Sequence, residues 1–372
     1  MKRKSKIKFF FDFATLITAF FSIGFICFQL MFPQRTAGAV REALISSATN
    51  VIPSLFPFMV ISRFIIALGM LSPIENTLGK GMSKLLGIPQ KSVSSLLIGI
   101  LSGFPIGAVT VCESYKKGEM TKDEAEFALC VSHNTGPAFP VGVVGVLLWN
   151  NKNFGVFIYF SQILAMLFLC LLKRKDRRGL YIRNTVPNYK AKKITASAAL
   201  TSSVTSSASS CVGIVGFIVI FKVITEMILS FIPIKFELIR TMISAVAEFS
   251  SGSASAAELG GAAGAAFSGF AVGFGGISAL MQACALTAET DLSIKKCALF
   301  KSIQGAVCAV MCTAYYNMFI KEDHVMEVYK KLETIQVNNF KYIAVLLVCA
   351  AAVIKYLGKK HKNTIQYTFF SL

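Results

Sequence analysis

The sequence predicts an all-α polytopic membrane protein with about eight transmembrane helices and additional broken or re-entrant helices. Of its 372 residues, 54% are apolar and only 15% are charged, whereas soluble domains carry about a quarter charged residues. Several apolar runs are long enough to cross the bilayer, which takes ~20 residues. Clusters of Lys and Arg flank these runs, as expected at the cytoplasmic ends of membrane helices.

The uninterrupted apolar runs are residues 9–31, 51–70, 92–111, 154–172, 211–232, 297–320 and 341–357. The first is longer than a secretory signal core and follows basic residues, so we expect an uncleaved helix with a cytoplasmic N-terminus. Residues 125–149 and 238–288 are apolar but interrupted by Gly, Ser, Pro and Asn. Because unpaired backbone groups cannot face lipid, these two regions predict broken or re-entrant helices buried in protein or lining a wet cavity.

A basic loop at residues 173–193 divides the chain near its middle. We therefore predict an N-terminal transmembrane anchor (1–39), a first repeat (40–172), the basic cytoplasmic linker (173–193), a second repeat (194–320), and a C-terminal part with a loop, the last transmembrane helix and a basic tail (321–372). The Ser/Thr/Ala-rich stretch 195–210 is interpreted as a polar lead-in to the next span. Matching interrupted segments in the two halves are typical of transporters built from inverted repeats, with the binding site at the breaks.

Charge and cysteine placement exclude several classes of function. The net charge of +19 comes from clusters beside apolar runs without interleaved aromatic residues, so it indicates membrane topology and anionic lipid, not nucleic acid. Nearly all of the ten cysteines lie inside apolar segments and lack metal-ligand spacing, so we interpret them as small core residues and expect neither a metal site nor disulfides. No catalytic motif is present, so we do not expect an enzyme.

The first half contains two candidate binding segments. "LSGFPIG" supplies Ser102, Gly103 and Phe104, and "SHNTG" supplies Asn134, Thr135 and Gly136. Helix ends at these positions would place unpaired backbone groups beside polar side chains, which suits a small polar ligand. His133 is weaker support, because a lone His is more often a structural group. The alternatives are a tight turn whose polar groups satisfy one another, and close helix packing through Gly103 and Gly107.

The second half contains two further candidate segments. They supply Glu248, Ser250 and Ser251 in "EFSSG", and Gly275, Gly276, Ser278 and Gln282 in "GFGGISALMQ". A carboxylate inside the membrane is costly and therefore predicts a functional site, for substrate or a coupling cation. Helix–helix hydrogen bonding is the alternative for Ser278 and Gln282.

For other residues of the second half we expect structural roles. Glu258 is expected at an interface. Lys222 and Glu226 lie four residues apart, and we expect them to neutralise one another on one helix face. The spacings 260–264 and 269–273 between glycines predict close helix packing.

The motifs together resemble the YlbJ family of sporulation integral membrane proteins. The resemblance rests on "PSLFPFMVISRFIIALGM", "LSGFPIGA" followed by "KKGEMTKDEAE", "SHNTGPAF", and "GFGGISALMQACALTAETDLS", and it covers roughly residues 40–320. It implies two copies of the nucleoside-recognition "gate" domain and a fold similar to that of concentrative nucleoside transporters. It also implies a place in the bacterial cell or forespore membrane and a link with dipicolinic acid and cortex formation. The family usually has a polar or charged group where this chain has "ISALMQ".

The resulting hypothesis is a transporter of a small polar, anionic metabolite, with dipicolinic acid as the candidate that the resemblance implies. A dicarboxylate needs positive partners, and His133, Arg63 and Lys222 are the ones considered. The alternatives are a membrane scaffold for cortex or envelope formation, a nucleoside transporter and, more distantly, an intramembrane enzyme. We expect no cofactor, although coupling to Na⁺ or H⁺ is left open. The expected partners are the lipid bilayer and the metabolite, with a homo-oligomer left open.

Overall fold

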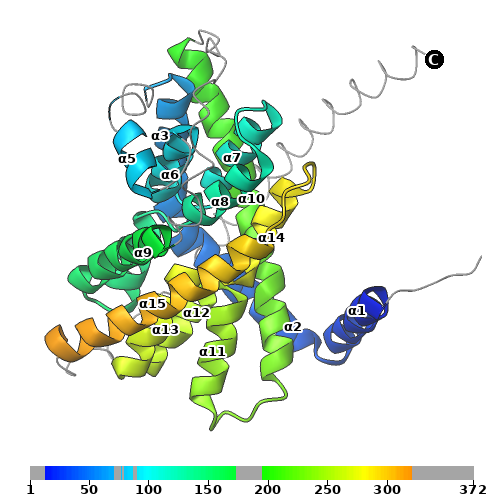
Figure 1. Cartoon of the computed structure of the whole chain (residues 1–372). Coiled ribbons are helices and arrows are strands. Elements are labelled where there is room, and N and C mark those ends of the chain that lie inside the picture. Colours follow the sequence, from blue (N-terminus) through cyan, green and yellow to red (C-terminus); the bar gives the residue numbers. More distant parts are fainter. Residues whose placement is uncertain (1–12, 71–76, 78, 87–89, 173–194, 321–372) are drawn as a thin grey trace, which may run out of the picture.

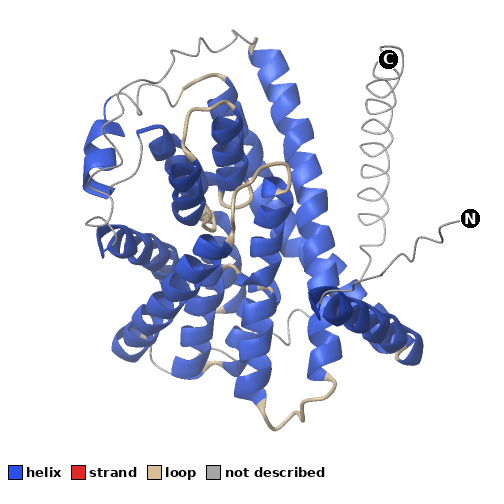
Figure 2. Cartoon of the chain, turned by 45° about the vertical axis from the view of Figure 1, so that its right-hand side comes forward, coloured by secondary structure: helices blue, strands red, loops and turns tan. Residues whose placement is uncertain are grey.

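The computed structural model describes residues 13–70, 77, 79–86, 90–172 and 195–320. The regular elements within these ranges are all helices (Figure 2), which confirms the all-α membrane class. Several predicted segments lie outside the described residues: the basic N-terminus, the loop 173–193, and the C-terminal part with its predicted helix 341–357.

In the first half, short helices lie in the chain between long helical segments at its beginning and end. They are α1 (Phe13–Met31), α2 (Pro33–Ser46), the π-helical turn η1 (Ser47–Val51), α3 (Ile52–Ala67), α5 (Gly79–Leu86), α6 (Gln90–Ser102), α7 (Ile106–Lys116), α8 (Lys122–Ser132), the π-helix η2 (Ala138–Leu148) and α9 (Lys152–Leu172). The boundary predicted at 39/40 falls inside α2. Since α2, η1 and α3 follow one another without interruption, they form one long helix.

The second half begins with the long helix α10 and ends with the long helix α15. Its elements are α10 (Ala196–Leu229), α11 (Glu237–Ala247), α12 (Phe249–Leu259), α13 (Gly261–Phe274), α14 (Gly276–Thr287) and α15 (Lys295–Phe319). In Figure 1, α15 runs diagonally across the molecule with α13 against it, and α12 packs on α13. Gly269 and Gly273 allow this close approach, because a Cβ on either would lie 2.6–2.7 Å from the Sγ of Cys312 or Cys308 on α15. The packing interpretation of this glycine pair is therefore confirmed.

Five helical segments among the described residues are long and apolar enough to cross a membrane. They are Pro33–Ala67, Lys152–Leu172, Ala196–Leu229, Gly261–Thr287 and Lys295–Phe319. The runs 154–172 and 297–320 are confirmed as single helices, whereas 51–70 and 211–232 are each part of a longer one. The Ser/Thr-rich stretch 195–210 is not a separate lead-in but belongs to α10. Its hydroxyls bond within the helix, as Ser203 Oγ does to the carbonyl of Ala199 at 2.7 Å.

The prediction of one continuous span at 92–111 is wrong. The chain breaks at Gly103, where the backbone φ is +75°, and at a cis peptide bond between Phe104 and Pro105. Helices α6 and α7 then pack against each other and against α8. At 1.5 Å per residue, the 13 residues of α6 extend only about 20 Å, so α6 alone is too short to cross the hydrocarbon. The region is instead a pair of half-length helices.

Candidate functional site

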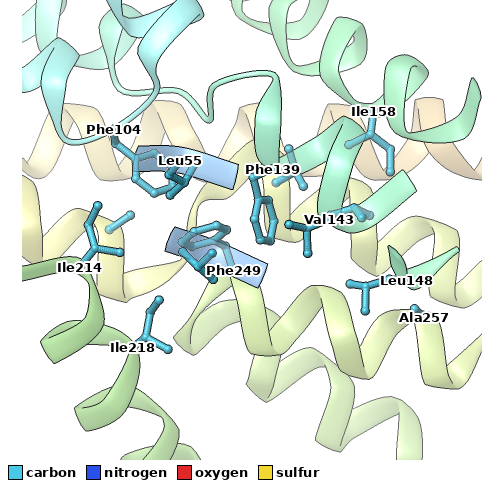
Figure 3. Packing of buried hydrophobic residues seen from close by; sticks show 14 of the residues in the cluster. Leu55, Phe104, Phe139, Val143, Leu148, Ile158, Ile214, Ile218, Phe249 and Ala257 are labelled. Carbon is cyan, nitrogen blue, oxygen red and sulfur yellow. The ribbon is translucent and has the colours of Figure 1, made fainter. Parts of the chain in front are cut away.

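Four helix breaks meet around the side chain of Phe104. They are residues 103–105 between α6 and α7, residues 133–137 between α8 and η2, Glu248 between α11 and α12, and Gly275 between α13 and α14. We call this set the break junction. The Phe104 ring stacks on His133 at 5.1 Å and meets Phe249 edge-on at 5.0 Å, and a Cβ on Gly275 would lie 3.4 Å from it. Figure 3 shows Phe104 and Phe249 side by side, with Phe139 beside Phe249. Segments from both halves of the chain therefore share one centre.

The two breaks of the first half are joined backbone to backbone. The N–H of Phe104 donates to the carbonyl of Asn134 at 2.7 Å. Gly103 has a φ of +75°, and a Cβ on it would collide with the backbone nitrogen of Gly136. A side chain at residue 103 would therefore both strain the backbone and separate the two breaks. The predicted residues of "LSGFPIG" and "SHNTG" thus lie in direct contact.

The two breaks of the second half are joined in a similar way. Glu248 is fully buried and caps α12, accepting the backbone N–H groups of Ser250 at 2.9 Å and Ser251 at 2.7 Å. Gly276 has a φ of +77°, and a Cβ on it would lie 3.0 Å from the Cα of Glu248. Both Glu248 oxygens are therefore used as a helix N-cap, which satisfies two amides that a helix end leaves unpaired.

A buried polar network lies behind the "SHNTG" break. Lys301 Nζ, on α15, donates to Asn134 Oδ1 at 3.1 Å and to Gln304 Oε1 at 2.9 Å. Gln304 Nε2 also donates to Asn134 Oδ1 at 3.0 Å. Gln162, on α9, accepts from the Thr135 hydroxyl at 2.7 Å and donates to the Thr135 carbonyl at 2.8 Å. Helices α8, α9 and α15 are thus joined at this break by hydrogen bonds.

Lys301 is the unusual member of this network. It is fully buried, and among the described residues no carboxylate lies within ion-pair distance of it. Burying an ammonium group is expensive unless it is paired. Its two neutral acceptors compensate only part of that cost, so the position favours an anion.

Several buried polar atoms around the junction have no hydrogen-bond partner. They are the hydroxyls of Ser102, Ser253 and Ser278, both ring nitrogens of His133, and both amide atoms of Gln282. Each such buried group costs roughly 1–3 kcal/mol. The groups come from both halves of the chain and lie at the breaks or within about two helical turns of them. Buried polar atoms without a partner need an explanation, and hydrogen bonds to a small polar ligand are one.

The predicted ion pair between Lys222 and Glu226 is wrong. Lys222 does not pair with Glu226; its Nζ lies 3.0 Å from a carboxylate oxygen of Glu42 on α2. The i, i+4 rule considers only one helix, whereas α2 packs along α10 and presents a closer carboxylate. Glu258 is exposed on α12. Neither Lys222 nor Glu258 is part of the break junction.

Sequence reasoning missed Lys301, Gln304 and Gln162. A signal for Lys301 was present, because a lysine inside the apolar run 297–320 is costly and predicts a functional position. Gln304 follows three residues later, on the same helix face. Gln162 lies in the middle of the run 154–172 and offered a similar signal. Their contact with Asn134 and Thr135 could not be read from spacing, since three helices contribute.

The site has no sign of a metal centre within the described part of the chain, where no group of three His, Cys, Asp or Glu side chains is placed to hold an ion. The buried cysteines of this part form no disulfide with one another, and all of them except Cys308 belong to the core clusters. The arrangement offers a cation, amides, hydroxyls and aromatic rings, which is the chemistry of binding a small polar molecule.

Comparison with known proteins supports the resemblance seen in the motifs. The Gate family model, described as nucleoside recognition, matches residues 48–150. The chain is also 24% identical over 331 residues to the sporulation integral membrane protein YlbJ of Bacillus subtilis (strain 168), which covers 80% of this chain and 81% of that protein. No solved structure matches the chain. The resemblance to YlbJ and to the Gate domain is thereby confirmed, while the second gate-type repeat and the likeness to concentrative nucleoside transporters stay predictions.

Proposed function

We propose that this membrane protein transports a small polar, anionic metabolite and that the break junction binds it. The observation that carries the proposal is Lys301, a buried lysine without a described carboxylate partner, set behind a junction of four helix breaks. Discontinuous helices that meet at the middle of a membrane protein are typical of transporter binding sites. Lys301 Nζ now donates to two neutral acceptors, Asn134 Oδ1 and Gln304 Oε1. An anionic oxygen of the substrate would replace them.

The other junction groups fit the same role. The unpartnered Ser102, Ser278 and Gln282 atoms would hydrogen-bond the polar edge of a substrate, and Phe104 and Phe249 would hold its apolar face. Movement of the α6–α7 or α11–α12 helix pair would open the junction, because the break within each pair is part of it. Ser250 and Ser251 support the site through the Glu248 cap.

Dipicolinate is the first candidate substrate. It carries two carboxylates on an aromatic ring, which matches a buried cation beside aromatic side chains. The similarity to a sporulation integral membrane protein makes a molecule of spore formation a suitable first choice, and it supports the cell or forespore membrane as the proposed location. The Gate model's description makes a nucleoside the second substrate to test.

The proposal is tested by uptake into proteoliposomes that contain the full chain. Labelled dipicolinate, succinate and uridine are compared for wild type, Lys301→Gln and the control Lys295→Gln, an exposed lysine of the same helix. We expect dipicolinate uptake to fall at least tenfold in Lys301→Gln, since a charge-assisted hydrogen bond is worth roughly 1.5–3 kcal/mol, and to be unchanged in the control. If no compound enters above empty vesicles, or if Lys301→Gln transports normally, the proposal is wrong.

A membrane scaffold for envelope or cortex formation is the second candidate. Its supporting observation is that Asn134, Thr135, Gln162 and Gln304 satisfy one another, as structural polar groups do. A scaffold would tolerate Lys301→Gln, whose neutral amide can still donate to Asn134 and Gln304. It would not tolerate Gly264→Leu, because a Cβ on Gly264 would collide with the Ala256 carbonyl. Heat-resistant spore counts in a spore-forming host that lacks its own relative would separate the two candidates. An enzyme is not proposed.

A further inference from the structure

A second polar site lies beside the break junction, between α3, α7 and α10. It is a pocket of about 290 Å³ whose lining includes Arg63, Ile106, Thr110, Glu113, Ser203 and Ser206. The volume is at the small end of ligand pockets. Ile106 belongs to both regions, since it begins α7 directly after the break at residues 103–105. The pocket is therefore close to the junction but has its own polar groups.

Arg63 and Glu113 give the pocket two opposite charges that are not joined. Both side chains line the cavity, yet they form no ion pair with each other. Arg63 Nη2 donates to Ser210 Oγ at 2.8 Å, and its buried Nε has no partner. Arg63 lies within the candidate membrane span Pro33–Ala67, and an arginine inside a membrane helix is costly and predicts a functional position. Opposite charges on the walls of one cavity favour a ligand that carries both charges.

The hydroxyl groups add acceptors to this arrangement. Thr110 Oγ1 donates a hydrogen bond to the Gly107 carbonyl at 2.8 Å, and Ser203 Oγ donates one to the Ala199 carbonyl at 2.7 Å. Each hydroxyl therefore retains lone pairs for a donor from the ligand. Arg63 is the one cation among the described lining residues, and its planar guanidinium suits a carboxylate. The pocket thus offers a carboxylate site together with a set of acceptors for an ammonium group.

We propose that this pocket binds a small zwitterion, a molecule with a carboxylate for Arg63 and an ammonium group for Glu113, Thr110 and Ser203. An α-amino acid has this chemistry and is small enough for the volume. Binding here is an equilibrium property of the pocket. It can therefore be measured whether or not the break junction transports a metabolite.

The test is isothermal titration of the purified full chain in detergent with L-serine and L-leucine, with succinate as the dianion and putrescine as the dication. We expect an amino acid to bind and the other two to bind at least tenfold more weakly. Arg63→Gln should weaken amino-acid binding about tenfold or more, because it removes a charge-assisted contact. Glu113→Gln should weaken it several-fold, since Glu113 is more exposed. Arg41→Gln, at an exposed arginine of α2, should leave binding unchanged.

Other outcomes overturn the proposal. These are no binding of either amino acid, unchanged binding in both Arg63→Gln and Glu113→Gln, or succinate binding that improves in Glu113→Gln and exceeds that of the amino acids. If Arg63→Gln does not fold, Ser206→Leu provides the second variant, because it fills the pocket from α10. Normal amino-acid binding to a folded Ser206→Leu protein would also show that the pocket is not the site.

Discussion

At residue 248, a buried carboxylate serves as the cap of a helix inside the protein. Glu248 ends α11, begins α12 and accepts two backbone N–H groups. A carboxylate in such a place is expensive, so its retention needs a reason. The cap supplies one, because the first amides of a buried helix must find an acceptor.

This role predicts the order of stability for two Glu248 variants. Glu248→Ala leaves both amides without an acceptor and should lower the free energy of unfolding by about 1–2 kcal/mol. Glu248→Gln retains one side-chain oxygen and should lose less. Detergent-denaturation curves of the purified protein measure both values. Equal stability of Glu248→Ala and wild type would show that the cap contributes nothing, and a stable Glu248→Gln that fails in uptake would indicate a further role in transport.

The candidate site residues differ in how far the sequence alone predicts them. Gly103, Pro105 and Gly275 are local signals, because glycine and proline in an apolar run mark a break wherever the run lies. The partners of Lys222 and Asn134 are not local. Lys222 pairs with a carboxylate of α2, and Asn134 meets a lysine far along the chain. Such contacts depend on how the helices pack, so a single sequence does not contain them in readable form.

At the scale of elements, the ends of α7 and α8 are tied to the α14–α15 connection by charges. Lys116 pairs with Glu289, and Lys122 Nζ lies 3.0 Å from Asp291, which also accepts the Tyr115 hydroxyl at 2.7 Å. The hydrogen bond from Tyr115 and then that from Lys122 lower the pKa of Asp291, and Lys116 lowers the pKa of Glu289. These groups lie outside the membrane-spanning helices.

These pKa shifts predict that the connection loosens in acid. A carboxylate with a lowered pKa in the folded state stabilises it above the unfolded value, which is near 4.5 for Glu and 3.8 for Asp, and loses that contribution as pH falls through the folded value. Hydrogen exchange of residues 287–294, corrected for the intrinsic rate, should therefore rise as pH falls below about 4.5. The double variant Glu289→Gln/Asp291→Asn should exchange faster at neutral pH and show a smaller pH effect. An unchanged profile in the double variant would contradict this account.

The hydropathy of the sequence predicts some helix boundaries correctly and others not. The run 154–172 contains no proline and few polar residues, and it is one helix, α9, as expected. The run 92–111 is also apolar on average, but Gly103 and Pro105 lie inside it. Their local effect outweighs the hydropathy of the run, since proline removes a backbone donor and glycine adopts a positive φ. An apolar average therefore predicts membrane depth better than it predicts continuity.

At the scale of the whole molecule, the outer surface of α9 shows how the protein meets the bilayer. Phe160, Leu164 and Phe168 are each about half exposed, at 54%, 53% and 52%, and repeat at helical spacing. The opposite face carries the buried Ser161 and Gln162, the latter in the polar network. The helix thus turns apolar groups outward and polar groups inward, the arrangement expected for a helix between lipid and a polar protein interior.

This arrangement predicts a position-dependent cost for a charge on the outer face of α9. Leu164→Arg, near the middle of the helix, should reduce membrane insertion or stability by about 2.5–3.5 kcal/mol. Leu172→Arg, an equally exposed position at the end of the helix, should cost much less, because the side chain can reach the interface. The membrane-inserted fraction of each variant in a glycosylation-reporter assay measures the difference. Equal insertion of the two variants would show that this face of α9 does not contact hydrocarbon, and the outward placement of its apolar side chains would then require a protein partner.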